Sequence, residues 1–124
     1  AGTVLYNRGM YAAMLAVEAA KTAQGIAGTS AITAADMRAG MESLVIDAAK
    51  MTELGLPGFG PEFTVSCDDH GGSGLGIVQQ WDAAAGAWNQ VTDYIASDLD
   101  VIDPLIMEDS SAYAAENNIS ERCG

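Results

Sequence analysis

The stretch MYAAMLAVEAA, residues 10–20, decides the fold of this chain because it leaves almost no polar face on a helix. The charged residues between positions 5 and 22 are Arg8, Glu18 and Lys21 alone. A helix that is apolar nearly all round belongs inside a larger structure, whereas a surface helix shows a single apolar stripe. We therefore expect other protein to cover this helix on more than one side.

The first four residues, Ala1-Gly2-Thr3-Val4, contain neither an initiator methionine nor the charged and apolar regions of a secretory signal. We interpret Ala1 as an internal cut in a longer protein. No run of about 18 apolar residues is free of charge and glycine, so the sequence predicts no membrane-spanning helix.

The composition is that of one ordinary soluble globular domain, with 124 residues of which 49% are hydrophobic and 18% are charged. Seventeen acidic residues against five basic ones give a net charge of −12. This charge repels phosphate backbones and anionic lipid headgroups. We therefore expect neither nucleic acid nor a membrane surface as a partner.

The acidic residues are densest between positions 98 and 109. They have neither the spacing nor the glycine of an EF-hand calcium loop. We interpret this segment as a solvated linker rather than a divalent-cation site. A short last helix over residues 110–117 and a tail are expected to follow it.

Cys67 and Cys123 are the only cysteines, and more than fifty positions separate them. This spacing fits neither a zinc ribbon nor a Cys-x-x-Cys redox motif. The sequence therefore predicts one long-range disulfide. In the loop-entropy model such a bond stabilises the fold by roughly 3 to 4 kcal/mol, and it indicates an oxidising compartment.

Three helices are predicted in the first half of the chain. The first ends in the glycine-rich and polar residues 24–30. The second begins at Thr33, which forms a capping box with Asp36, and continues through apolar residues to position 45. The third is short, capped by Asp47 and ended by Gly55.

The pattern changes from helical to alternating after Pro61. Phe63 and Val65 alternate with polar residues, which predicts a short half-buried strand. Residues 75–81 and 87–91 are rich in β-branched and aromatic side chains and are predicted as strands joined by a hairpin loop. We expect the two tryptophans to flank that hairpin.

The segment Cys67-Asp68-Asp69-His70 holds the only histidine, beside two carboxylates and a thiol. Adjacent residues of an extended loop diverge, whereas a metal ion needs ligands that converge on one point. The same geometry and the predicted disulfide disfavour a Cys–His catalytic pair. We therefore expect no metal, no cofactor and no catalytic residue, and keep a metal-dependent hydrolase using these residues as a lesser hypothesis.

Tyr6, Asn7 and Arg8 are the candidate ligand-binding residues because they gather at the N-terminal end of an otherwise apolar helix. Orphan amides and the positive end of the helix dipole suit an anionic or hydroxylated ligand there. Tyr6 would add a ring face and a hydroxyl. The structural alternative is that Asn7 caps the helix and Arg8 pairs with one of the many acids.

Two segments together carry a family resemblance: residues 6–19, which open with Tyr-Asn-Arg-Gly, and residues 61–82, which contain an Asp-His-x-Gly loop and a Gln-Trp-Asp strand end. In their order and spacing, residues 1 to about 95 resemble the C-terminal portion of a type I periplasmic substrate-binding protein of the branched-chain amino acid (Leu/Ile/Val-binding) ABC transporter family. The acidic segment and the tail to Cys123 resemble a branch that binds small carboxylates, including aromatic acids.

The resemblance implies an α/β fold in which two lobes, each a parallel sheet covered by helices, close on a ligand about a hinge of crossing strands. Residues 1–66 would supply helices and a strand of one lobe, and residues 67–74 a hinge crossing. Residues 75–124 would supply the terminal strands of the other lobe, the acidic linker and the C-terminal helix. Of the family's ligand contacts, only one aromatic position carries over, onto Tyr6.

The function that the resemblance implies is a non-enzymatic periplasmic receptor of an ABC importer, present as a C-terminal fragment. It would bind branched-chain amino acids or related small carboxylates and deliver them to an ABC permease. The missing residues would cover the apolar first helix, so we expect the fragment alone to self-associate through that helix. The alternative is a self-contained small interaction or assembly module that uses the apolar N-terminal helix as its partner surface.

Overall fold

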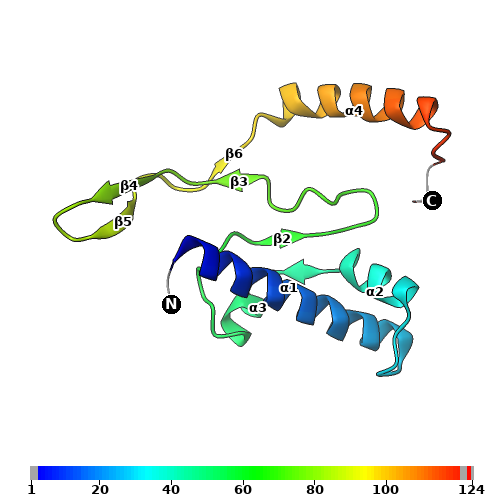
Figure 1. Cartoon of the computed structure of the whole chain (residues 1–124), viewed down its shortest axis with the longest axis horizontal. Helices are drawn as coiled ribbons and strands as arrows, with labels where there is room; N and C mark the ends of the chain where they lie inside the picture. Colours follow the sequence, from blue (N-terminus) through cyan, green and yellow to red (C-terminus); the bar gives the residue numbers. More distant parts are fainter. Residues whose placement is uncertain (1–2, 121–122, 124) are drawn as a thin grey trace. The chain divides into compact units, whose positions relative to one another are not determined.

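A computed structural model describes residues 3–120 and 123 of the chain. The chain forms a mixed α/β structure with short antiparallel strands, and it divides into two compact units, residues 1–72 and residues 73–124 (Figure 1). The first unit contains α1 (Val4–Ala27), α2 (Ala34–Met41), β1 (Val45–Ile46), α3 (Ala48–Glu53) and β2 (Phe63–Thr64). The second unit contains β3 (Leu75–Gly76), β4 (Gln79–Asp82), β5 (Ala87–Gln90), β6 (Ile95–Ala96) and α4 (Leu99–Glu116).

The general α/β prediction is therefore confirmed, but the specific partial binding-protein fold is not. The described strands pair as three separate two-stranded antiparallel ribbons, β1 with β2, β3 with β6 and β4 with β5. The parallel sheet that the resemblance implied needs crossover connections between neighbouring strands. None of the described strand pairs has that arrangement.

Helix α1 is the predicted first helix, and both of its ends have a local cause. Thr3 is the N-cap, and its side chain accepts a hydrogen bond from the backbone N–H of Tyr6 at 3.3 Å. At the other end Gly28 adopts the left-handed conformation, with φ of 67°, that ends many helices. Thr3, and not Asn7, therefore caps this helix.

One face of α1 packs inside the first unit, and the opposite face does not. Glu18, Ala19 and Ala23 are buried, whereas Met10 and Val17 on the opposite face are 41% and 57% exposed. Within the described residues, the expectation of cover on more than one side is thus not met. The helix has its apolar composition, but the described residues of the first unit cover only one side of it.

Helix α2 crosses α1 at very close range because a glycine lies at the contact. A Cβ on Gly40 would collide with the carbonyl oxygen of Ala19 and would lie 2.7 Å from both the Cβ and the backbone nitrogen of Ala23. The capping box predicted for α2 is present: Asp36 N–H donates to Thr33 Oγ1, and Thr33 N–H donates to Asp36 Oδ2.

The second helix ends at Met41, earlier than the helical spacing to position 45 suggested. Val45 and Ile46 instead form β1, which pairs with Thr64 and Phe63 of β2. Pairing with a distant strand outweighs the local pattern here, because two β-branched residues fit an extended backbone well. The short strand predicted around Phe63 is confirmed as β2.

The core of the first unit is small. It contains the buried side chains of Ala19, Leu44, Ile46 and Met51, and partly buried aromatic and aliphatic residues surround it. Met51 comes from α3, which is capped by Asp47 as predicted and is followed by Gly55 with φ of 73°.

Glu18 is a buried charge at the edge of this core, only 6% exposed. Its carboxylate lies 2.7 Å from Lys21 Nζ and 3.6 Å from Lys50 Nζ, and Lys50 also pairs with Glu53 at 2.8 Å. A buried carboxylate is tolerated when cations satisfy it. This ion pair network therefore ties α1 to α3.

The second unit begins with β3, and the predicted hairpin follows as β4 and β5. These two strands pair so that Trp81 lies opposite Trp88, with ring centroids 5.4 Å apart. In the loop, Asp82 Oδ1 accepts hydrogen bonds from the N–H groups of Ala84 and Ala85. Cross-strand aromatic pairing and this turn account for the hairpin.

The interpretation of the acidic segment as a linker is wrong. Residues Leu99–Glu116 form α4, a helix of 18 residues that begins well before position 110 and contains Pro104. Asp98 and Asp100 lie at its N-terminal end, where the helix dipole favours negative charge. The acids therefore support a helix start rather than a solvated linker.

The structure contains the predicted disulfide. Both Cys67 and Cys123 are disulfide-bonded, and the chain has no other cysteine. Arg38 on α2 extends its guanidinium to within 3.6 Å of Cys67 Sγ.

Candidate ligand site

An open hollow of about 500 Å³ lies at the N-terminal end of α1 in the first unit. One wall is α1, and the other is the loop that follows α3. The lining residues are Val4, Asn7, Arg8, Tyr11, Gly58, Phe59, Gly60 and Pro61.

Helical spacing explains why three of the α1 residues share this wall. Asn7 and Arg8 precede Tyr11 by four and three positions, so each of them is a neighbour of Tyr11 on the helix surface. Tyr11 also packs against Phe59 and Phe63, with ring centroids 6.0 and 6.4 Å away. The aromatic cluster fixes the loop against the helix and makes the floor of the hollow apolar.

The polar groups of the hollow come from Asn7 and Arg8. Arg8 makes no ion pair with the acids in the described part of the chain, so its guanidinium is available to an anion. The pairing that the structural alternative assigned to Arg8 is therefore not seen there. A guanidinium beside an amide and two aromatic rings suits a small molecule with a carboxylate and an apolar body.

Tyr6 is placed differently from its two neighbours. It does not line the hollow, and it is 51% exposed. Tyr6 precedes Tyr11 by five positions, which places the two side chains about 140° apart around the helix, so Tyr6 faces away from Tyr11. The structure thus brings together two of the three candidate residues, and the ligand contact assigned to Tyr6 stays a prediction.

Tyr11 and Phe59 are lining residues that sequence reasoning missed. Residues 58–61, with two glycines and a proline, have in sequence only the composition of a turn-rich connector. The helical spacing from Asn7 to Tyr11 was a usable signal for the first residue. No local signal shows that a loop about fifty positions later packs on the same side of α1.

The segment around His70 forms a turn rather than a converging site. Asp69 Oδ1 accepts a hydrogen bond from the N–H of Gly71 at 2.8 Å, and His70 Nε2 lies 3.4 Å from Glu42 Oε1. Within residues 3–120 and 123, no three His, Cys, Asp or Glu side chains are grouped so that they could hold a metal ion. The hydrolase hypothesis therefore has no metal cluster to support it among these residues.

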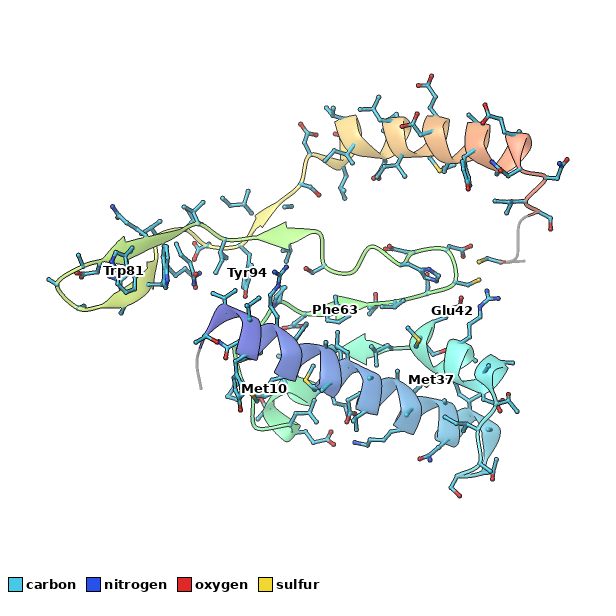
Figure 2. All side chains as sticks on the ribbon, in the orientation of Figure 1. Met10, Met37, Glu42, Phe63, Trp81 and Tyr94 are labelled. Carbon is cyan, nitrogen blue, oxygen red and sulfur yellow. The ribbon has the colours of Figure 1, made fainter. Side chains whose placement is uncertain are left out.

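Glu42, at the end of α2, is the carboxylate that organises this turn (Figure 2). Arg38 Nε donates to Glu42 Oε1 at 2.8 Å, and this hydrogen bond holds the pKa of the Glu42 carboxyl below its usual value of 4.5. Burial acts in the opposite direction, and the charges of Arg38 and His70 lower the pKa further. The group is therefore a stable anion that holds Arg38 and His70 in place.

The chain is similar to the crystal structure of an ABC transporter permease from the Pseudomonas fluorescens group. The similarity covers 98% of this chain with 40% sequence identity and a TM-score of 0.87. This chain spans 29% of the length of that permease chain. No protein-family model matches the chain, and no curated protein matches it.

This comparison overturns the resemblance to a periplasmic substrate-binding protein. The similar structure is a transporter permease and not a solute receptor, so the receptor function is wrong. The self-contained interaction module gains no support either. The part of the expectation that the comparison supports is the similarity to an ABC transporter protein.

The motifs behind the resemblance misled for a physical reason. Asp69 and Asp82 each accept hydrogen bonds from backbone N–H groups two or three positions later. Such turns recur in unrelated proteins, because aspartate forms them through its own short side chain. The Asp-His-x-Gly and Gln-Trp-Asp motifs thus describe turns and not a function.

In the part of the chain that the structure describes, no helix combines the length and the apolar character needed to cross a membrane.

Proposed function

We propose that this chain is a segment of an ABC transporter component, corresponding to the matched part of the permease. The similarity in sequence and structure along nearly the whole chain carries this proposal. The role is non-enzymatic: the chain contributes a folded segment to a transport assembly.

The proposed location is the periplasm. The disulfide between Cys67 and Cys123 supports it, because disulfides persist in oxidising compartments such as the bacterial periplasm and are rare in the cytosol. A transporter segment on that side of the membrane would meet solutes as they arrive.

The proposed ligand of the hollow is a small solute with a carboxylate. Arg8 and Asn7 would hold the carboxylate, and Tyr11 and Phe59 would contact the apolar part. The absence of an ion pair on Arg8 in the described part of the chain supports this assignment, since an unpaired guanidinium is ready to bind an anion.

The transport role is tested by removing the coding region of this chain from its host. ATP-dependent uptake of radiolabelled amino acids and small carboxylates is then measured in intact cells. We expect uptake of at least one solute to fall to background and to return when the wild-type sequence is restored. Unchanged uptake of the whole panel would overturn the role.

The ligand assignment is tested in the same cells with Arg8→Gln and with Lys21→Gln as a matched control. Because Lys21 pairs with the buried Glu18, a second control is Leu5→Gln, which also places a glutamine near the start of α1, at a residue that is 78% exposed and does not line the hollow. Arg8→Gln should raise the solute concentration for half-maximal uptake by about tenfold, which corresponds to one charge-assisted hydrogen bond. Equal effects of Arg8→Gln and Leu5→Gln would contradict the assignment.

A further inference from the structure

Helix α1 presents a second apolar face, opposite the face that packs in the first unit. The outer face of α1 is defined here by Tyr6, Met10, Ala13 and Val17, which follow one another at spacings of three or four residues. Tyr6, Met10 and Val17 are 51%, 41% and 57% exposed. Charged side chains are absent from this face.

The described residues of the first unit do not pack on that face. The buried residues of the helix, Glu18, Ala19 and Ala23, lie toward α2 and the core, and the ion pairs of Glu18 are on that side as well. Gly40 already brings α2 into contact with the backbone of α1 there. The packing of the first unit is thus complete without the outer face.

The outer face has the chemistry of a protein contact. A chain with a net charge of −12 has enough acidic side chains to keep a solvated helix polar, yet none lies on this face. Ala13 and the neighbouring Gly9 are small enough for another element to approach closely, and Met10 adapts to an irregular surface. A contiguous apolar patch of this kind marks an interaction site.

The comparison indicates what covers this face. This chain corresponds to 29% of the permease chain, so most of that chain lies outside the match. In a longer chain of this kind, the residues outside the matched segment would pack on an uncharged helix face of that segment. A second copy of this chain is less suitable, since each copy carries twelve negative charges.

We infer that the outer face of α1 is the docking surface for the remainder of a longer transporter polypeptide, bound through an apolar and uncharged surface of that remainder. This inference rests on the proposed function, because the permease supplies the longer chain. It adds the surface by which the segment joins the rest of the protein.

The test uses a chimera in which this sequence replaces the matched segment of the full permease chain. Val17→Cys and Ile26→Cys are introduced separately, and their reaction with a maleimide is timed. The two native cysteines are disulfide-bonded, so the new thiol is the one that reacts. Val17 and Ile26 are matched controls, since they are 57% and 56% exposed on the same helix but lie on different faces.

In the isolated chain, at low concentration, both thiols should react at similar rates. In the chimera the reaction at Val17→Cys should slow at least tenfold, while that at Ile26→Cys stays within about twofold. Equal rates at both positions in the chimera, whether fast or slow, would overturn the inference. Should the chimera not fold, the same thiols are timed on the isolated chain mixed with the permease lacking its matched segment, and no protection of Val17→Cys there would overturn it.

The two proposals fail separately. Protection of Val17→Cys in a host whose ATP-dependent uptake is unchanged by deletion of this chain supports the docking surface and overturns the transport role. Loss of uptake on deletion, combined with an unprotected Val17→Cys, keeps the transport role and overturns the docking surface.

Discussion

Gly40 is the residue on which the packing of the first two helices depends most directly. The position of its missing Cβ is occupied by backbone atoms of Ala19 and by Ala23, which cannot rotate away. Gly40→Ala should therefore force α1 and α2 apart and lower the free energy of unfolding by about 1–3 kcal/mol. Urea denaturation followed by circular dichroism measures the change.

Gly25 is the control for this substitution because it also lies in a helix but has no atom within 4 Å of its Cβ position. Gly25→Ala should raise the free energy of unfolding by about 0.5–1 kcal/mol through the lower conformational entropy of the unfolded chain. A similar loss for both variants would mean that close packing at Gly40 is not the cause.

The hydrogen-bonded carboxyl groups make stability depend on acid pH. The backbone and side chain of Thr33 hold the pKa of Asp36 below its usual value of 3.8, and Arg38 holds that of Glu42 below 4.5. A lowered pKa in the folded state contributes stability above the unfolded value, and this contribution disappears as pH falls through the folded value. We expect the urea midpoint to be level from pH 7 to 5 and to fall below about pH 4.5. A midpoint that rises on acidification would contradict these pairings.

At the scale of elements, the β4–β5 hairpin depends on its tryptophan pair. A two-stranded ribbon is marginally stable in water, and Trp81 and Trp88 are both about half exposed, so their mutual contact is the main apolar gain. Trp88→Ala should lower the stability of the hairpin by about 0.5–1 kcal/mol. Amide hydrogen exchange in residues 79–90 should then become roughly two- to fivefold faster. Exchange in α2 serves as the internal reference and should not change.

The accuracy of the sequence-based prediction differed between elements. The capping box of α2, the cap of α3 and the hairpin turn were predictable because each depends on hydrogen bonds between residues two to four positions apart. The extent of α4 was missed because acidic residues were counted as solvated charge. The acidic residues at positions 98 and 100 stand just before apolar residues such as Val101 and Ile102, and this pattern indicates the start of a helix.

At the scale of the whole molecule, the disulfide constrains the chain over a long range in the sequence. It closes a loop of more than fifty residues, for which the chain-entropy model gives about 4 kcal/mol. Replacing both cysteines by serine should lower the urea midpoint of the chain to a similar extent as a reducing agent does. If a reducing agent also shifts the urea midpoint of the double variant, the agent acts on something other than this disulfide.

The isolated chain is expected to self-associate because its apolar surface lacks a cover. Val17 on α1 is 57% exposed, and α4 has no buried residue. Light scattering should show assemblies whose mass rises with concentration, and Val17→Glu should weaken them while Ile26→Glu has less effect. A monodisperse monomer without dye-binding apolar surface would contradict this expectation.

Only part of the candidate site was predictable from the sequence, because the contacts that complete it join residues far apart in the chain. Asn7 and Arg8 were identified from their place near a helix start, but Tyr11, Phe59 and the loop that completes the hollow were not. The turn motifs pointed to the wrong class of transporter protein because they specify local backbone geometry.

The sequence by itself determined the helix caps, the turns, the hairpin and the disulfide pair, since each follows from local hydrogen bonding or from the presence of only two cysteines. Only the tertiary structure decided which face of α1 is buried and that residues 45–46 form β1 instead of continuing a helix. It alone also placed Phe59 beside Arg8 in the lining of the hollow. An apolar helix has no preferred side until a partner approaches it. In this chain the close approach permitted by Gly40 selects one side and leaves the other exposed.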